Sequence, residues 1–362
     1  MNSLCKTGCL IAMFVCLSGA VALANEPVQT QKPKEKLDVK ELILEHLADS
    51  YTWHITKIGN SEVSIPLPVI VYSKITGWHV FLSSAFIENP VHDGLLIATD
   101  GKYKGKIVEK DAQGNEVKPF DISITKVVLS LLFNSSLLIF IILLVARSYK
   151  KDTFESKKGF IGFMEMFIMN INDDVIKPCI GKDYRQFSPY LLTVFFFIFL
   201  NNLMGIVPIF PGGANVTGNI AITFTLAICT FLIVNIFGTK EYWKEIFWPD
   251  VPLWLKVPLP LMPAIELVGV FTKPFALMIR LFANMLAGHS IVLGLTCLVF
   301  VTVSLGPAMN TSMTVVSVLF TVFINLVEVL VAYIQAYVFV LLSAVFIGLA
   351  RVEPHHVKEV TK

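Results

Sequence analysis

Five polar side chains interrupt an otherwise apolar stretch of the sequence: Glu266, Lys273, Arg280, Asn284 and His289. An ionised side chain near the centre of a bilayer costs at least about 2.5–3.5 kcal/mol on insertion scales. Glu266, Lys273 and Arg280 are spaced seven residues apart, which is close to two helical turns, so they form one polar stripe on a helix. This stripe predicts an ion path through a membrane. A set of charges that neutralise each other between packed helices is the alternative.

A second polar pair, Glu328 and Gln335, lies near the C-terminus with the same spacing of seven residues. If the two segments form an antiparallel hairpin in which Arg280 is level with Gln335, His289 is level with Leu326. Glu328 then lies two residues from that level, or about 3 Å along the helix axis. One register therefore brings together an Arg–Gln pair and a His–Glu pair. It fixes their height and leaves the rotation of each helix open.

Each of these pairs predicts a different chemistry. A histidine titrates near neutral pH and a buried carboxylate can be shifted toward that range, so His289 and Glu328 are able to relay protons. Arginine stays charged under cellular conditions, so Arg280 is a poor relay. Arg280 is instead suited to attract a carboxylate on a partner and to block the direct leakage of ions.

The composition places these residues in an integral membrane protein. Apolar residues make up 55% of the chain and charged residues 15%, with a mean hydropathy of +0.69, whereas soluble domains have about 25% charged residues. The net charge of +2 and the absence of a basic run predict no nucleic-acid partner. Cys179, Cys229 and Cys297 are scattered, so we expect neither a disulfide framework nor a metal site, and no cofactor.

The N-terminal third differs from the rest. Residues 1–24 contain a lysine, an apolar run and the pattern Ala22-Leu23-Ala24, which predicts a cleavable secretory signal, with a retained anchor helix as the alternative. Residues 25–125 begin with a charged tether and continue with short β-prone segments separated by glycine and proline, which predicts a small β-rich extramembrane domain. Its histidines are irregularly spaced and are expected to be surface or packing residues: His46, His54, His79 and His92.

Five later apolar runs are long enough to cross a bilayer, at 127–146, 188–207, 219–238, 259–304 and 313–349. Lysine and arginine follow the first, third and fifth runs, which predicts that these ends are cytoplasmic and that residues 25–125 are extracytoplasmic. The last two runs are too long to stand upright in a bilayer, so they must tilt, bend or break.

A different pattern occupies residues 154–178, where apolar residues recur at a spacing of three and four. This predicts an amphipathic helix on the cytoplasmic membrane surface that ends at Pro178, with packing against a soluble domain as the alternative.

We therefore predict an all-α integral membrane protein with five transmembrane helices and one amphipathic cytoplasmic-surface helix. The last two helices form a long, steeply tilted hairpin, and a small β-rich domain precedes the membrane part. The expected parts are a signal peptide, an extracytoplasmic extension, a membrane domain and a cytoplasmic tail, at 1–24, 25–125, 126–352 and 353–362.

The polar residues stand in motifs that resemble subunit a of F-type ATP synthases. These are Glu266, Thr-Lys-Pro, Ile-Arg-Leu-Phe-Ala-Asn-Met-Leu-Ala-Gly-His-Ser, and Glu328 followed by Ile-Gln-Ala-Tyr-Val-Phe. Asn201-Asn-Leu-Met-Gly-Ile-Val-Pro is similar to an earlier span of that family. The resemblance covers roughly residues 126–352, and the β-rich domain is similar to an extension found in some bacterial members.

The resemblance implies a stator subunit that is not an enzyme by itself and that provides two offset half-channels against a rotating ring of c subunits. Arg280 would meet each ring carboxylate, with Asn284 and Gln335 as polar groups near it. A carboxylate of the cytoplasmic exit would be Glu266.

The outer half-channel pair would be His289 and Glu328, in the order found in mitochondrial relatives and reversed in some bacterial ones. Such an exchange preserves the chemistry if the two side chains are neighbours. Gly205 stands where some relatives carry an acid, which puts a role for an acid at that position in doubt.

The resemblance further implies the c ring, b-type peripheral stalk subunits and, indirectly, the catalytic head as partners, in the inner membrane of a bacterium with the C-terminus cytoplasmic. The proton is the expected ion, and sodium is left open. A self-contained secondary transporter is the competing interpretation, although the chain has no obvious internal repeats. A zinc protease is disfavoured because a His-Glu-x-x-His motif is absent from the sequence.

Overall fold

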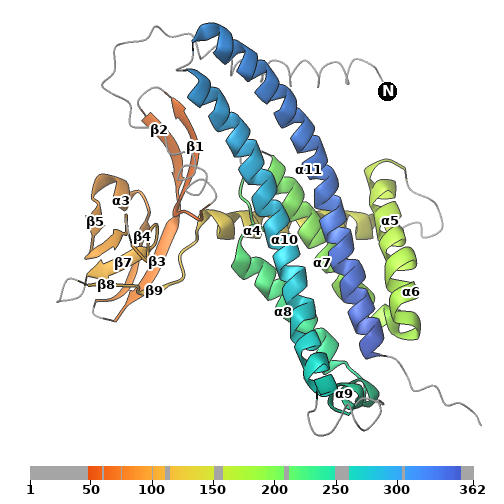
Figure 1. Cartoon of the computed structure of the whole chain (residues 1–362). Coiled ribbons are helices and arrows are strands. Elements are labelled where there is room, and N and C mark those ends of the chain that lie inside the picture. The colour runs from red at the N-terminus through yellow and green to blue at the C-terminus, as the bar shows by residue number, and fades with distance from the viewer. Residues whose placement is uncertain are drawn as a thin grey trace, which may run out of the picture. The chain divides into compact units, whose positions relative to one another are not determined.

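A computed structural model describes residues 48–351 except for short gaps, which are 59–60, 75, 100, 111–114, 151–157, 208–211, 249–260 and 304–305 (Figure 1). The predicted signal peptide, the tether that follows it, His46 and the predicted tail at 353–362 lie outside the described residues.

The described part of the N-terminal region is rich in β-structure, as predicted, and forms three small antiparallel sheets. One is a pair of strands, β1 (Thr52–Ile58) and β2 (Ser61–Pro66). A second has β3 (Pro68–Ser73) between β4 (Gly77–Leu82) and β9 (Phe120–Asp121). The third consists of β5 (Val91–His92), β6 (Leu95–Ile97), β7 (Ile107–Lys110) and β8 (Glu116–Val117), and a short helix, α3 (Ala85–Glu88), precedes it.

The core of this domain is small and has one polar member. Val69, Val71, Leu95 and Ile107 pack together with Tyr51 and are almost completely buried. The Tyr51 hydroxyl donates to Asp121 Oδ2 at 2.5 Å. Burial and this hydrogen bond both raise the pKa of Tyr51.

The domain continues into the first long helix through hydrogen-bonded backbone. Ile122 N donates to Ile70 O, Ile124 N donates to Pro68 O and Lys126 N donates to Ser50 O. The helix α4 (Lys126–Tyr149) then begins, with Thr125 as its N-cap residue.

The remainder of the described chain is helical, and the chain is a multi-pass membrane protein. Four of its helical segments are long and apolar enough to cross a membrane, or five if α8 (Ile220–Ile236) is taken together with α9 (Lys240–Phe247), which bends away from it by 101°. The other long helices are α7 (Tyr184–Ile206), α10 (Leu261–Thr302) and α11 (Pro307–Ala350). Each of these five helices lies close to its predicted position in the sequence.

The predicted amphipathic helix differs from the expectation at its C-terminal end. It begins as α5 (Phe160–Asn170), passes through a π-helical turn (Ile171–Ile176) and continues as α6 (Lys177–Ile180) beyond Pro178. Pro178 lies in the first turn of α6, directly after the π-helical turn, where the regular pattern of α-helical hydrogen bonds is already interrupted. The helix ends instead at Gly181, whose φ of +77° favours glycine.

The helical core lies where α7 packs against α11 and against the segment from α5 to α6. Leu191, Phe195 and Ile198 of α7 are completely buried, and the small Ala336 and Ala344 of α11 are also completely buried. Small residues let helix backbones approach closely.

The last two helices lie side by side as an antiparallel hairpin (Figure 1). Ser317 Oγ of α11 donates to Leu295 O of α10 at 2.5 Å, and Thr302 Oγ1 donates to Asn310 Oδ1 at 3.2 Å near the turn. With 42 and 44 residues, α10 and α11 are about 63 and 66 Å long at 1.5 Å per residue. Both exceed the roughly 30 Å of a hydrocarbon core.

Candidate functional site

A histidine and a carboxylate meet inside the α10–α11 hairpin. His289 Nδ1 lies 2.8 Å from Glu328 Oε1, and the two side chains are only 13% and 6% exposed. The predicted register of the hairpin is therefore confirmed for this pair. In a buried place such a pair can hold or pass a proton while keeping its net charge low.

Gly288 provides the space that the carboxylate occupies. A Cβ atom added at Gly288 would lie 2.7 Å from Glu328 Oε1, which is closer than a real Cβ approaches another heavy atom. Any larger residue at this position would therefore displace the Glu328 carboxylate from His289. The sequence shows a glycine directly before His289, but only the register of α10 and α11 shows that this glycine leaves room for the Glu328 carboxylate.

The other nitrogen of the imidazole faces α7. A Cβ atom added at Gly205 would lie 3.3 Å from His289 Nε2, so the imidazole packs closely against the α7 backbone at this glycine. His289 Nε2 is buried and has no hydrogen-bond partner among the described residues. The position at which some relatives carry an acid is thus adjacent to His289, and in this chain the acid beside the imidazole comes from Glu328 on α11.

Further polar groups lie one turn from Gly205 and were not predicted as a set. Asn134 Nδ2 of α4 donates to Asn201 Oδ1 at 3.0 Å, and Thr217 Oγ1 donates to Asn202 Oδ1 at 2.6 Å. Asn134 Oδ1 and Asn202 Nδ2 remain without a partner among the described residues although they are buried. Buried polar atoms of this kind are commonly satisfied by ordered water.

Arg280 points away from the packed side of α10. Leu277, Leu281 and Met285 of the same helix are buried, whereas Arg280 and Asn284 are exposed. Arg280 makes neither a hydrogen bond nor an ion pair with any residue that the structure describes, so the expected Arg280–Gln335 contact is not formed within this part of the chain. Gln335 itself is buried on α11. The guanidinium is therefore available to a group outside the chain.

Small residues flank Arg280 on this exposed side of α10. Ala283 and Ala287 are exposed, at spacings of three and seven residues from Arg280. Because small side chains allow close approach of a neighbouring helix, this stripe is suited to a helical partner. The spacing of these small residues is visible in the sequence, but only the structure shows that they face outward.

The remaining members of the predicted polar stripe are half-buried. Glu266 lies near the beginning of α10, and Lys273 Nζ lies 5.7 Å from the centre of the Phe346 ring on α11, a cation–π contact. Glu266, Lys273 and Arg280 form no ion pair with one another in the described structure. The alternative of mutually neutralised charges is therefore not supported.

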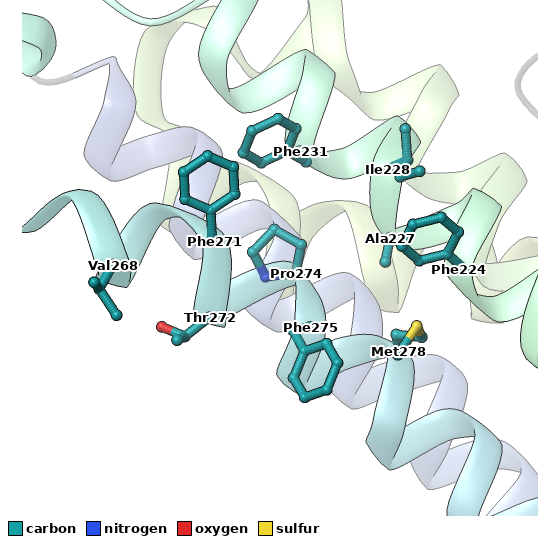
Figure 2. Close-up of a pocket in the computed structure, with 10 residues that line it drawn as sticks. All are labelled: Phe224, Ala227, Ile228, Phe231, Val268, Phe271, Thr272, Pro274, Phe275 and Met278. Atoms are coloured by element: carbon teal, nitrogen blue, oxygen red, sulfur yellow. The ribbon is translucent and has the colours of Figure 1, made fainter.

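A hollow of about 520 Å³ lies elsewhere, between α8 and α10. Figure 2 shows side chains of α8 and α10 around it, including Phe224, Ile228, Phe231, Phe271, Phe275 and Met278. Thr272 is the one polar residue of its lining. Because Arg280, His289 and Glu328 are not part of this apolar lining, the hollow is not suited to ions.

The sequence matches two family models. Residues 128–348 match a family described as ATP synthase A chain, and residues 42–125 match a family described as a domain of unknown function. The first match covers more than half of the chain and includes α7, α8 and every polar residue of the α10–α11 hairpin.

Several relatives of known identity are similar to the same part. Subunit a of the ATP synthase of Chloroherpeton thalassium is 42% identical over 250 residues, which cover 67% of this chain and 70% of the relative. Subunit a 2 of Chlorobaculum tepidum is 44% identical over 245 residues, 65% of each chain. Subunit a of Myxococcus xanthus is 39% identical over 243 residues, 65% of this chain and 75% of the relative.

The motifs around Arg280, the paired His289 and Glu328, and these matches lead to one family. The chain belongs to the ATP synthase A chain family, the subunit a family of F-type ATP synthases, whose members are non-catalytic subunits of the membrane sector.

Proposed function

We propose that this chain conducts protons through the membrane sector of an F-type ATP synthase, along two half-channels that meet a rotating ring of c subunits. The observation that carries the proposal is the combination, on one helix, of a buried His289 paired with Glu328 and an exposed Arg280 that forms no ion pair with any residue the structure describes. A relay and a fixed positive barrier are the two parts that such a path requires, since a path without a barrier would leak.

The outer half-channel runs past His289 and Glu328. A proton arriving at His289 Nε2 converts the imidazole to its cation, and the proton on Nδ1 can then pass to Glu328 Oε1 at 2.8 Å. The buried, unpartnered atoms of Asn134 and Asn202 support an aqueous approach to this pair. Glu328, or water next to it, then delivers the proton to a carboxylate of the ring.

Arg280 separates the two half-channels. Its permanent charge attracts the ionised carboxylate of each ring subunit and repels cations that would pass directly. Asn284, one turn away and equally exposed, provides a polar contact on the same surface, and Gln335 provides another from α11. The exposed Ala283 and Ala287 let a ring helix approach.

The inner half-channel ends near Glu266. This carboxylate is half-buried near the start of α10, on the same helical stripe as Arg280. A ring carboxylate that has completed nearly a full turn releases its proton past Glu266 to the cytoplasm.

The membrane topology in this proposal has five transmembrane helices, α4, α7, α8, α10 and α11, with the segment from α5 to α6 on the cytoplasmic surface. Basic residues stand at or just after the ends of α4, α8 and α11, and they support cytoplasmic ends there: Arg147, Lys240 and Arg351. The lengths of α10 and α11 support a steep tilt.

Within this topology, residues 25–125 are extracytoplasmic, 126–352 form the membrane domain and 353–362 form a cytoplasmic tail, and residues 1–24 are a signal peptide. The location is the inner membrane of a bacterium. The c ring and b-type stalk subunits are direct partners in the proposal, and the catalytic head is an indirect one.

The test is ATP synthesis by the assembled complex in vesicles under an imposed proton gradient. Arg280→Ala should abolish synthesis, while assembly of the complex is checked by the co-purification of its other subunits. Normal synthesis by an assembled Arg280→Ala complex would refute the proposal. Ion-coupled substrate uptake by this chain alone would favour the secondary transporter instead.

A further inference from the structure

The sheet formed by β4, β3 and β9 has one face toward the domain core and a second, exposed face that is apolar. Val69 and Val71 of β3 point to one side, where they are completely buried in the domain core. An antiparallel sheet at a protein surface usually has one polar face toward water. The second face of this sheet does not follow that rule.

Six large apolar side chains are exposed on the second face, which we call the outer sheet face: Tyr72, Trp78, Val80, Leu82, Phe120 and Ile122. Tyr72 pairs with Trp78 on β4 and with Phe120 on β9, and the Tyr72 and Trp78 rings lie 5.1 Å apart. Directly opposed residues in antiparallel strands share a face, so the six side chains form one patch. Trp78 is 61% exposed and Val80 is 70% exposed, which shows how little of the patch the described chain covers.

A patch of this kind needs an occupant. Soluble domains rarely expose contiguous apolar patches of more than a few hundred Å², and larger ones mark contacts with proteins or membranes. The acid closest in sequence, Asp121, points to the opposite side, where it accepts hydrogen bonds from Tyr51 and Ser123. The outer sheet face itself therefore contains no charged side chain.

The outer sheet face lies only a few residues before the beginning of α4, a transmembrane helix in the proposed topology. Ile122 lies four residues before Lys126, the first residue of α4, so the two are at most about 14 Å apart at 3.3–3.6 Å per residue. The intervening backbone is hydrogen-bonded to β3 through Ile122 and Ile124. No long linker separates the patch from the bilayer surface where α4 begins.

The chemistry of the patch and its margin favours a lipid surface over a protein. Trp78 and Tyr72 are of the types that gather at membrane interfaces, and Phe120 is of a type that inserts from the apolar face of interfacial segments. Lys74 directly follows β3 and Lys118 lies two residues before β9, so both are close in sequence to the Tyr72–Phe120 pair, and neither forms an ion pair with a described residue. An apolar surface with a basic margin is complementary to a bilayer that contains anionic phospholipids.

We propose that the outer sheet face lies on the bilayer at the end where α4 begins, with its aromatic side chains in the headgroup layer and Lys74 and Lys118 against anionic headgroups. The domain then anchors the start of α4 at the membrane surface. This inference goes beyond the conduction of ions and does not depend on it.

The test uses the assembled complex reconstituted into vesicles of phosphatidylcholine, with or without phosphatidylglycerol. A photoreactive p-benzoylphenylalanine replaces Phe120 or, as a second probe on the outer sheet face, Val80. The matched control replaces Ile87, which is 67% exposed on α3 of the same domain but lies outside the patch. After illumination, adducts of this chain with lipid and with protein are separated by mass.

We expect lipid adducts at positions 120 and 80 to exceed those at position 87 at least fivefold, with a preference for phosphatidylglycerol that falls by half or more in a Lys74→Gln/Lys118→Gln variant. Equal lipid adducts at all three positions, or adducts of positions 120 and 80 with another subunit, would overturn the proposal. An unchanged preference in the lysine variant would overturn the assignment of the basic margin. Proton-driven synthesis is not a readout here, so the outcome is separate from that of the proposed function.

Discussion

Exchanging the two members of the buried pair tests whether they act together. In the double variant His289→Glu/Glu328→His the same two groups occupy the hairpin in reversed positions. Glutamate and histidine side chains reach a similar distance from their Cα atoms, and the glycines at 288 and 205 leave both side chains of the pair close to a neighbouring backbone without a Cβ in the way. The exchange is therefore sterically possible, and each group keeps its partner.

The size of the expected effect follows from the distance between the groups. Two unit charges 4 Å apart interact with about 4 kcal/mol at an effective dielectric constant of 20, and the pair here is closer, at 2.8 Å. Each single variant places two like groups side by side and loses this interaction, while proton transfer by a positioned side chain contributes about 10²–10⁴-fold in rate. We expect each single variant to lower proton-driven synthesis about 100-fold and the double variant to recover to within about tenfold of the unmodified chain.

The assay is the initial rate of ATP synthesis in vesicles under an imposed pH difference, normalised to the amount of assembled complex. Ser290→Ala is the matched control, since Ser290 neighbours the pair on α10 but its hydroxyl donates to the backbone of Leu286. If the double variant is no more active than the single ones while the control stays normal, His289 and Glu328 do not act as a pair.

Three further variants test the surroundings of the pair and the β-rich domain. Gly288→Ala should slow proton-driven synthesis at least tenfold because its Cβ displaces the Glu328 carboxylate. Gly294→Ala on the same helix is the control and should not slow synthesis, because the added atom meets nothing within 4 Å. Equal rates for the two variants would contradict the close approach of Glu328 to Gly288. Gly205→Asp should partly restore synthesis to a Glu328→Gln variant by placing a carboxylate beside the imidazole, and no recovery would show that position 205 cannot replace 328. Tyr51→Phe should lower the stability of the domain by about 1–2 kcal/mol through loss of a buried hydrogen bond, measured by thermal unfolding. Because the pKa of Tyr51 is raised in the folded domain, the stability that this side chain contributes is present below its ordinary pKa of about 10 and is lost as the pH rises above that value. If the Tyr51→Phe variant and the unmodified chain lose stability equally at alkaline pH, the prediction is contradicted.

The elements of the membrane part were largely predictable because apolar length and helical period are local properties of the sequence. The same period and one assumed register placed His289 opposite Glu328, and the structure confirms this contact. Rotation about the helix axes was not predictable, because it depends on the packing of α10 against α8 and of α11 against α7. For this reason the outward direction of Arg280 and the absence of a described contact with Gln335 emerged only from the structure.

Other features depend on contacts between distant segments and left weak signals. Asn134 stands alone in the apolar run of α4, and its bond to Asn201 joins two helices separated by 67 residues. In the β-rich domain the composition indicated strands, but the pairing of β3 with β9 across the whole domain could not be read from local patterns. The predicted end of the amphipathic helix at Pro178 is wrong, because the helix continues to Ile180 and stops at Gly181, whose φ of +77° favours glycine.

The most direct test of the central claim is the distance from the Arg280 guanidinium to the nearest carboxylate in an experimental structure of the assembled membrane sector. The account predicts a carboxylate of a neighbouring ring subunit within about 4–6 Å, the range in which an opposite charge stabilises an ionised acid. An Arg280 that is paired with an acid of its own chain, or that faces lipid away from any ring subunit, would contradict it.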